Sequence, residues 1–379
     1  MFSKNKVSIW YLYGPIITVF FIYLAFFIAT SIYNVDLKIA EVADDALNYE
    51  IWKYWSQFYA VAGNTELIIT FYILLLLTIQ SLKYRGIENK KTGFFYTNKY
   101  LIQVCVIIFC AIWTGIHIFQ LVKLKYGSSG FGPGFDAELL DSYKYKFVGK
   151  ILVICYQIPI VYYASWFLVV KLPKADKEFH YKYMSGAIKG MSFTLLTYAY
   201  VVFIKVFGAR PYYYNVIFGD LFEKIPEERQ KYYIEHREFF FGNNDGNGNF
   251  TQNVEGVWPW WTVNNVWMRG EGYTNKTFLD YAFPSGHVNA CLCTASIYYV
   301  FYDKKLNREL DLKRYLILIW LLFSTLSMSF AVVVMRWHWL SDTSFSIVVG
   351  IIMFYATHKL IDAIINKREN KINVAKSAK

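Results

Sequence analysis

Long apolar runs separated by short charged connectors constrain this chain more than any other feature of its sequence. A spanning helix needs roughly 20 predominantly apolar residues, and about eight such runs can be traced along the chain. They predict an all-α fold, a multi-pass transmembrane helical bundle of about eight spanning helices. The runs are Tyr13 to Ile32, Leu67 to Leu82, Tyr100 to Val122, Ile151 to Val170, Met184 to Phe207, Val288 to Tyr302, Tyr315 to Met335 and Thr343 to Ile365.

The distribution of charge predicts how the bundle is oriented. The formal net charge is +11, but the basic residues lie in short tracts between apolar runs, which argues against a nucleic-acid partner. Basic tracts precede the first run and follow each even-numbered run, as Lys83, Lys174, Lys305 and Lys367 illustrate. The positive-inside rule then places both termini in the cytoplasm of a cell-membrane protein. The first outer connector is acidic, with Asp36, Glu41, Asp44, Asp45 and Glu50.

The sequence Pro284-Ser285-Gly286-His287 comes directly before the sixth run and has the form of a helix start. The first backbone N–H groups of a helix and its positive dipole end suit a phosphate group. Glycine lets an anion approach the backbone closely, and a histidine can donate a proton to a leaving oxygen. A plain helix cap with a chance histidine explains the motif equally well.

A second pattern, Arg336-Trp337-His338-Trp339-Leu340-Ser341-Asp342, fills the outer turn between the last two runs. His338 and Asp342 are four residues apart and would share one face of a helical turn. The carboxylate could hold the proton of one ring nitrogen while the other nitrogen attacks, the arrangement of a catalytic triad with histidine as nucleophile. The alternative is an ordinary pair on an interfacial turn.

Two cations, Lys205 and Arg210, mark the outer end of the fifth run. Such residues can extend to the membrane boundary without further role, or they can clamp a phosphate group. The expected topology, built without these motifs, places them at the outer face together with Ser285, His287, His338 and Asp342. This agreement favours a site on that face.

These stretches resemble the phosphatidic acid phosphatase type 2 superfamily of integral-membrane phosphatases, which carries K-x6-RP, PSGH and SR-x5-H-x3-D in this order. The corresponding stretches here are KVFGARP, PSGH and RWHWLSD. The resemblance implies that His338 forms a phosphohistidine, Asp342 orients it and His287 protonates the leaving alcohol. It further implies that Lys205, Arg210, Ser285 and Gly286 hold the phosphate, without a metal or other cofactor.

The resemblance also implies a division of the chain. A six-helix phosphatase core is expected over 100–366, with a long outer loop at 209–284. Residues 1–99 are expected to be a two-helix membrane addition, and residues 367–379 a basic cytoplasmic tail.

The chain departs from the family pattern at two cations. Lys205 precedes Arg210 by five residues where the family has seven, and five residues do not return to the same helix face. Ala331-Val332 stand where the family has Ser-Arg. Arg336, four residues after Val332, is the expected substitute because it would lie one turn on and on the same face.

Taken together, the sequence predicts a metal-independent membrane phosphatase that hydrolyses a phosphomonoester or diphosphate of a lipid through a phosphohistidine. Its expected partners are a lipid phosphate substrate and membrane lipids. Two alternatives stay open: a lipid phosphotransferase of the same fold, and a membrane scaffold or transporter without catalytic activity.

Overall fold

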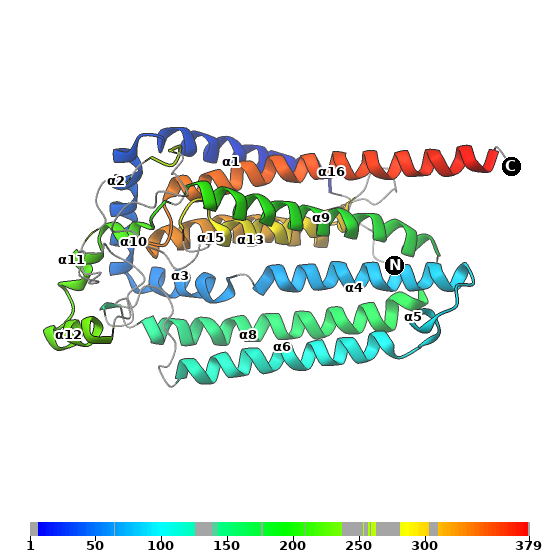
Figure 1. The fold of residues 1–379 in the computed structure, drawn as a ribbon, viewed down its shortest axis with the longest axis horizontal. Coiled ribbons are helices and arrows are strands. Elements are labelled where there is room, and N and C mark those ends of the chain that lie inside the picture. Colours follow the sequence, from blue (N-terminus) through cyan, green and yellow to red (C-terminus); the bar gives the residue numbers. More distant parts are fainter. Residues whose placement is uncertain are drawn as a thin grey trace.

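The computed structural model describes residues 7–63, 65–125, 139–140, 142–175, 177–208, 210–236, 253, 257, 259–262, 281–302 and 310–377. Within these ranges the regular structure is helical, and no β-strand is present. Figure 1 shows long helices lying side by side, with short helices gathered at one end. The expected all-α bundle is therefore confirmed.

Among the described residues, seven segments are long and apolar enough to cross a membrane. Large apolar side chains remain exposed on them, such as Ile107 at 67%, Phe203 at 64% and Trp320 at 57%. Lipid is the solvent that such surfaces require. The segments contain helices α1 (Trp10–Ala29), α3 (Glu50–Ala62) with α4 (Thr65–Glu88), α6 (Leu101–Lys125), α8 (Ser142–Trp166), α9 (Lys177–Gly208), α15 (Leu312–Val334) and α16 (Leu340–Ser377).

The sixth apolar run differs from the expectation of a full span. It folds as α13 (Gly286–Thr294), the 3-10 turn Ala295–Ile297 and α14 (Tyr298–Phe301). Every residue of α13 from Val288 onward is buried, since α13 packs against α4, α9, α15 and α16. This run is apolar because it is enclosed by other helices, so it can be shorter than a helix that faces lipid.

Two other boundaries differ from the sequence expectation. The second span is longer than predicted and is interrupted after Ala62, where Gly63 adopts a positive φ of 44° that glycine tolerates best. At the other end of the chain, α16 continues to Ser377 through most of the expected tail. Figure 1 shows this helix projecting beyond its neighbours.

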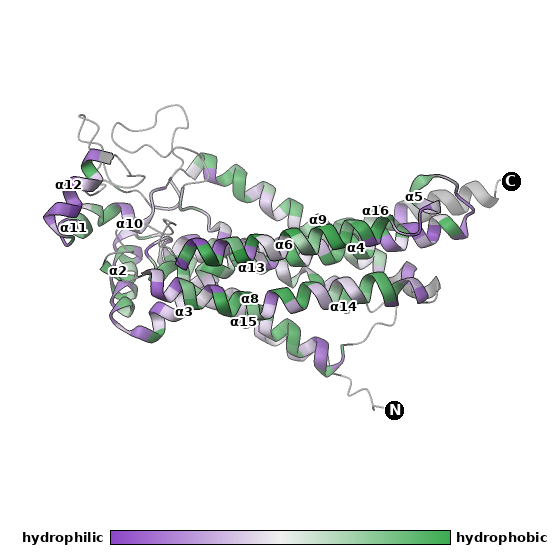
Figure 2. Cartoon of the chain, turned by 90° about the horizontal axis from the view of Figure 1, so that it is seen from below, coloured by the Kyte–Doolittle hydropathy of each residue, from purple (hydrophilic) through white to green (hydrophobic). Residues whose placement is uncertain are grey.

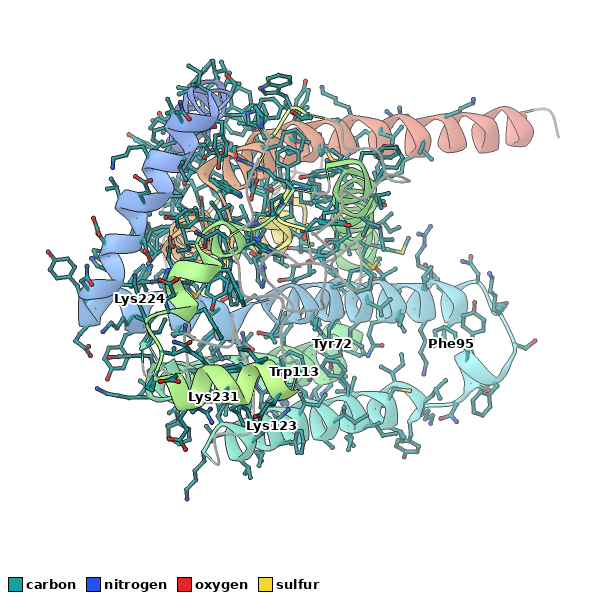
Figure 3. All side chains as sticks on the ribbon, turned by 60° about the vertical axis from the view of Figure 1, so that its left-hand side comes forward. Tyr72, Phe95, Trp113, Lys123, Lys224 and Lys231 are labelled. Atoms are coloured by element: carbon teal, nitrogen blue, oxygen red, sulfur yellow. The ribbon has the colours of Figure 1, made fainter. Side chains whose placement is uncertain are left out.

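One end of the bundle carries the short helices α2 (Tyr33–Asp44), α10 (Tyr213–Val216), α11 (Phe218–Phe222) and α12 (Glu227–His236). Helix α2 runs crosswise over this end in Figure 1, whereas α5 (Phe94–Thr97) lies at the opposite end. Figure 3 likewise places Lys224 and Lys231 far from Phe95. Figure 2 shows hydrophobic residues along the long helices and many hydrophilic ones where α11 and α12 lie.

Candidate active site

The segment Phe283–His287 forms the entrance to α13. The hydroxyl of Ser285 accepts a hydrogen bond from the backbone N–H of Val288 at 3.4 Å, so Ser285 is the expected N-cap. The hydroxyl of Ser346 donates to the carbonyl groups of Ser285 and Asp342, at 3.1 and 2.9 Å. A Cβ atom added to Gly286 would meet nothing within 4 Å. Open space therefore adjoins the first turn of α13.

Helix α15 ends at Val334, and the following turn brings His338 to the start of α16. The backbone N–H groups of Trp337 and His338 both donate to the carbonyl of Val332, at 3.0 and 3.1 Å. Nδ1 of His338 lies 3.2 Å from Oδ2 of Asp342, which also accepts the backbone N–H of Trp339 at 3.0 Å. The carboxylate thus engages Nδ1, which leaves Nε2 as the nitrogen on the other side of the ring.

The two imidazole rings lie next to each other. The ring centroids of His287 and His338 are 6.1 Å apart, with the rings inclined at 66°. Trp337 packs against the first ring and Tyr212 against the second, at 5.2 and 5.5 Å between centroids. The two histidines that the sequence singled out, from segments some fifty residues apart, therefore meet in one place.

Burial is the main influence on both imidazoles. It lowers the pKa of His287 to about 3, helped by the nearby charges of His338 and Lys205. Burial also lowers the pKa of His338, which Lys205 lowers further. Asp342 and a backbone hydrogen bond at Ala282 act in the opposite direction on that group. Burial therefore favours the neutral form of both rings.

Arg210 lies in the centre of this cluster and is only 1% exposed. Its Nη1 donates to Oδ1 of Asp342 at 3.2 Å and to the hydroxyl of Ser341 at 2.5 Å. Its Nη2 donates to Oδ2 of Asp36 at 3.0 Å. The guanidinium stacks 4.4 Å from the ring centroid of Trp339, whose indole N–H donates to the carbonyl of Pro211. Arg210 is thus fixed in place between two carboxylates.

Lys205 is also buried, and its Nζ donates to the carbonyl of Tyr281. Its charge contributes to lowering the pKa of both His287 and His338. The five-residue spacing to Arg210 therefore does not remove Lys205 from the vicinity of the histidines.

Arg336 occupies a different position from the one its spacing predicted. Because α15 has already ended, Arg336 has a positive φ of 64° and no longer follows the helical face of Val332. Its Nε donates to Oδ1 of Asp44, at the end of α2. A role for Arg336 in binding phosphate stays a prediction, and this pairing does not support it.

Asp36 is the member of the cluster that the sequence interpretation missed. It was noted only as one acidic residue of the first outer connector, yet it is fully buried, and both Oδ atoms receive hydrogen bonds from Ser341. A signal was available: Asp36 precedes Ala40 by four residues, and these two are the buried residues of α2. A carboxylate on the buried face of an amphipathic helix needs a partner.

The fold and this cluster define a helical membrane protein in which two histidines, two aspartates and two cations meet at one end of the bundle. A sequence model of the PAP2 superfamily matches residues 186–365. The chain is 30% identical over 345 residues to an uncharacterized protein of Mycoplasma capricolum subsp. capricolum, covering 89% of each chain. The chain belongs to the PAP2 superfamily. No solved structure matches it.

Proposed function

We propose that this protein cleaves a P–O bond of a phosphorylated lipid through a phosphohistidine at His338. The observation that carries the proposal is the pair of adjacent imidazoles, of which His338 has Nδ1 at 3.2 Å from the carboxylate of Asp342. Membership in the PAP2 superfamily supports phosphatase chemistry in general. The exposed apolar helices support a lipid substrate, whose tails would stay in the bilayer.

The proposed reaction has two steps. Nε2 of His338 attacks phosphorus, the bond to the leaving oxygen breaks, and His287 gives its proton to that oxygen. Water then loses a proton to His287, attacks the phosphorus and releases His338. Asp342 holds the imidazole orientation and stabilises its positive charge during attack. Lys205, Arg210 and the first turn of α13 are the proposed phosphate contacts.

The low pKa of His287 bears on this mechanism. A group with a pKa of about 3 is an effective proton donor once protonated, but few molecules carry the proton at neutral pH. A bound phosphate favours protonation, because its negative charge opposes the effect of burial. The acid would therefore be loaded mainly when substrate is present.

A second candidate is transfer of the phosphate group to a lipid or sugar hydroxyl in place of water. One observation favours it: Val332 stands at the position of the family arginine, and Arg336 is paired with Asp44. A weaker hold on the phosphate group suits an enzyme that passes the group onward. Chemistry at His338 and His287 is the same in both reactions.

The test uses purified protein in detergent with a panel of phosphorylated lipids and no added metal. We expect product formation and an acid-labile phosphoenzyme in the wild type, both abolished by His338→Gln. His358→Gln is the matched control, because His358 lies near the middle of α16, where it stacks on Tyr299 and pairs with Asp362 rather than with the candidate site residues. Product that appears only with an added alcohol would assign transfer. Equal behaviour of wild type and His338→Gln on every lipid would refute the proposal.

We further propose that the site faces the outside of the cell membrane, as the basic connectors predict. Helix α2, which belongs to the acidic connector expected outside, lies at the same end of the bundle as α11, whereas α5 lies at the opposite end (Figure 1). A thiol at each end therefore tests the orientation. With Cys105 and Cys155 replaced by serine, Lys224→Cys should react with an impermeant thiol reagent in intact cells, and Phe94→Cys should not. The reverse pattern would invert the orientation.

A further inference from the structure

The ion pair between Arg210 and Asp36 lies inside the candidate active site. The side chains are 1% and 0% exposed, so water and salt screen this pair little. Asp36 comes from α2, far from the other site residues in the sequence, and it also binds the backbone N–H and hydroxyl of Ser341. A carboxylate with this many contacts is held firmly at the arginine.

The pair changes the charge that a phosphate group meets. Among the described residues, the buried charged side chains in the cluster beside the two histidines are Lys205, Arg210, Asp36 and Asp342. Arg336 is also buried, but its charge is paired with Asp44 and is counted with that pair. Within the cluster, two are positive and two are negative, so this set is neutral when both imidazoles are neutral. Protonation of His287 adds a single positive charge.

Phosphate groups differ in the charge they bring to such a site. A phosphomonoester carries about 1.5 to 2 negative charges at neutral pH, whereas a phosphodiester carries one. In a buried site an unmatched charge is costly, because little solvent is present to compensate it. With one positive charge on His287, the site and a singly charged phosphate group sum to zero. With a doubly charged phosphate group, one negative charge stays uncompensated.

Arg210 nevertheless retains capacity for a ligand. Within the described part of the chain its Nε atom makes no hydrogen bond, although the side chain is buried. The guanidinium can therefore offer an N–H to a phosphate oxygen while Asp36 and Asp342 neutralise its charge. Arg210 can therefore donate a hydrogen bond to the phosphate group while adding little net positive charge to the site.

We propose that Asp36 is a specificity-determining residue, which neutralises Arg210 and thereby selects substrates whose phosphate group carries one negative charge, such as phosphodiester lipids. The inference rests on the proposed function, whose chemistry at His338 it leaves unchanged. In a diester, attack by His338 breaks the bond to the lipid alcohol, His287 protonates that oxygen, and the second ester group stays on the phosphohistidine.

The test compares two lipids that differ by one methyl group. Dioleoyl phosphatidylmethanol is a diester with one charge, and dioleoyl phosphatidic acid is a monoester. Both release diacylglycerol when the same P–O bond breaks. We expect the wild type to prefer phosphatidylmethanol in kcat/KM, and Asp36→Asn to shift the ratio towards phosphatidic acid by about tenfold, which corresponds to about 1.4 kcal/mol.

Asp44→Asn is the matched control, because it removes a charge from the same helix but at the pair with Arg336. Its substrate ratio should equal that of the wild type. A purely structural role for Asp36 would lower the thermal stability of Asp36→Asn and leave its ratio unchanged, and that outcome overturns the inference while the proposed function stands.

A binding measurement separates this inference from catalysis and needs no variant. Dodecylphosphonate, above its second pKa, is a dianion, and its monomethyl ester is a monoanion. We expect the monoester to raise the melting temperature of the wild type at lower concentration. Tighter binding of the dianion overturns the inference. Selective binding of the monoanion without turnover of any lipid supports it and refutes the proposed reaction.

Discussion

Arg210 and Arg336 were both expected to hold phosphate, and each is paired with a carboxylate of α2, yet their surroundings differ. Arg210 is fixed by Asp36 and Asp342 and stacks on Trp339. Arg336 lies in the turn after α15, where its partner Asp44 is 26% exposed. The same kind of ion pair therefore belongs to the candidate site at Arg210, whereas at Arg336 it holds the turn after α15 against α2.

The largest effect is expected for Arg210→Ala, which leaves Asp36 and Asp342 as buried carboxylates without their shared cation. Removing one partner of a buried ion pair costs roughly 3–5 kcal/mol, so we expect a large drop in thermal stability and loss of activity. Arg210→Lys retains the charge but not the fork that reaches both carboxylates. It should fold and still lose most activity. Full activity of this variant would show that bridging by Arg210 is unimportant.

An intermediate effect is expected for Lys205→Met, which tests the cation that binds a backbone carbonyl. Burial lowers the pKa of His287 to about 3, and an essential acid with this pKa in the free enzyme makes kcat/KM fall as pH rises above that value. Loss of the Lys205 charge should raise the pKa of both histidines, so the falling limb should move to higher pH. Lys224→Met, at the surface, is the control. An unchanged profile at measurable activity would contradict a position of Lys205 beside the imidazoles.

The smallest effect is expected for Arg336→Ala. Arg336 itself is buried, but its partner Asp44 is 26% exposed, so solvent screens this pair more than the pair of Arg210 with Asp36. We expect a small loss of thermal stability and a change in kcat/KM of only a few-fold. A loss comparable with that of Arg210→Lys would restore Arg336 as a phosphate ligand and break the distinction between the two arginines.

The sequence predicted most of the fold because a spanning helix has a fixed length requirement that apolar runs make visible. It was less exact at the sixth run, which folds as a shorter helical stretch whose first part is buried among other helices. It also could not locate the interruption after Ala62, which depends on the backbone of Gly63.

For the site, short-range patterns were informative and long-range contacts were not. The spacing of His338 and Asp342 predicted their contact, and the Ser285 cap was predicted from its local motif. The spacing argument for Arg336 assumed a continuous helix, whereas α15 ends at Val334. The contact between Asp36 and Arg210 joins residues 174 positions apart, a separation at which one sequence offers no periodicity to use.

Helix α2 affects which residues a shortened form of the protein must keep. The family match begins at residue 186, and a shortened protein designed on it would omit Asp36 and Asp44. Such a truncation would leave a buried guanidinium lacking one counter-charge and would uncover the end of the bundle. We therefore expect the smallest stable unit to include α2 together with the helices that carry the two histidines.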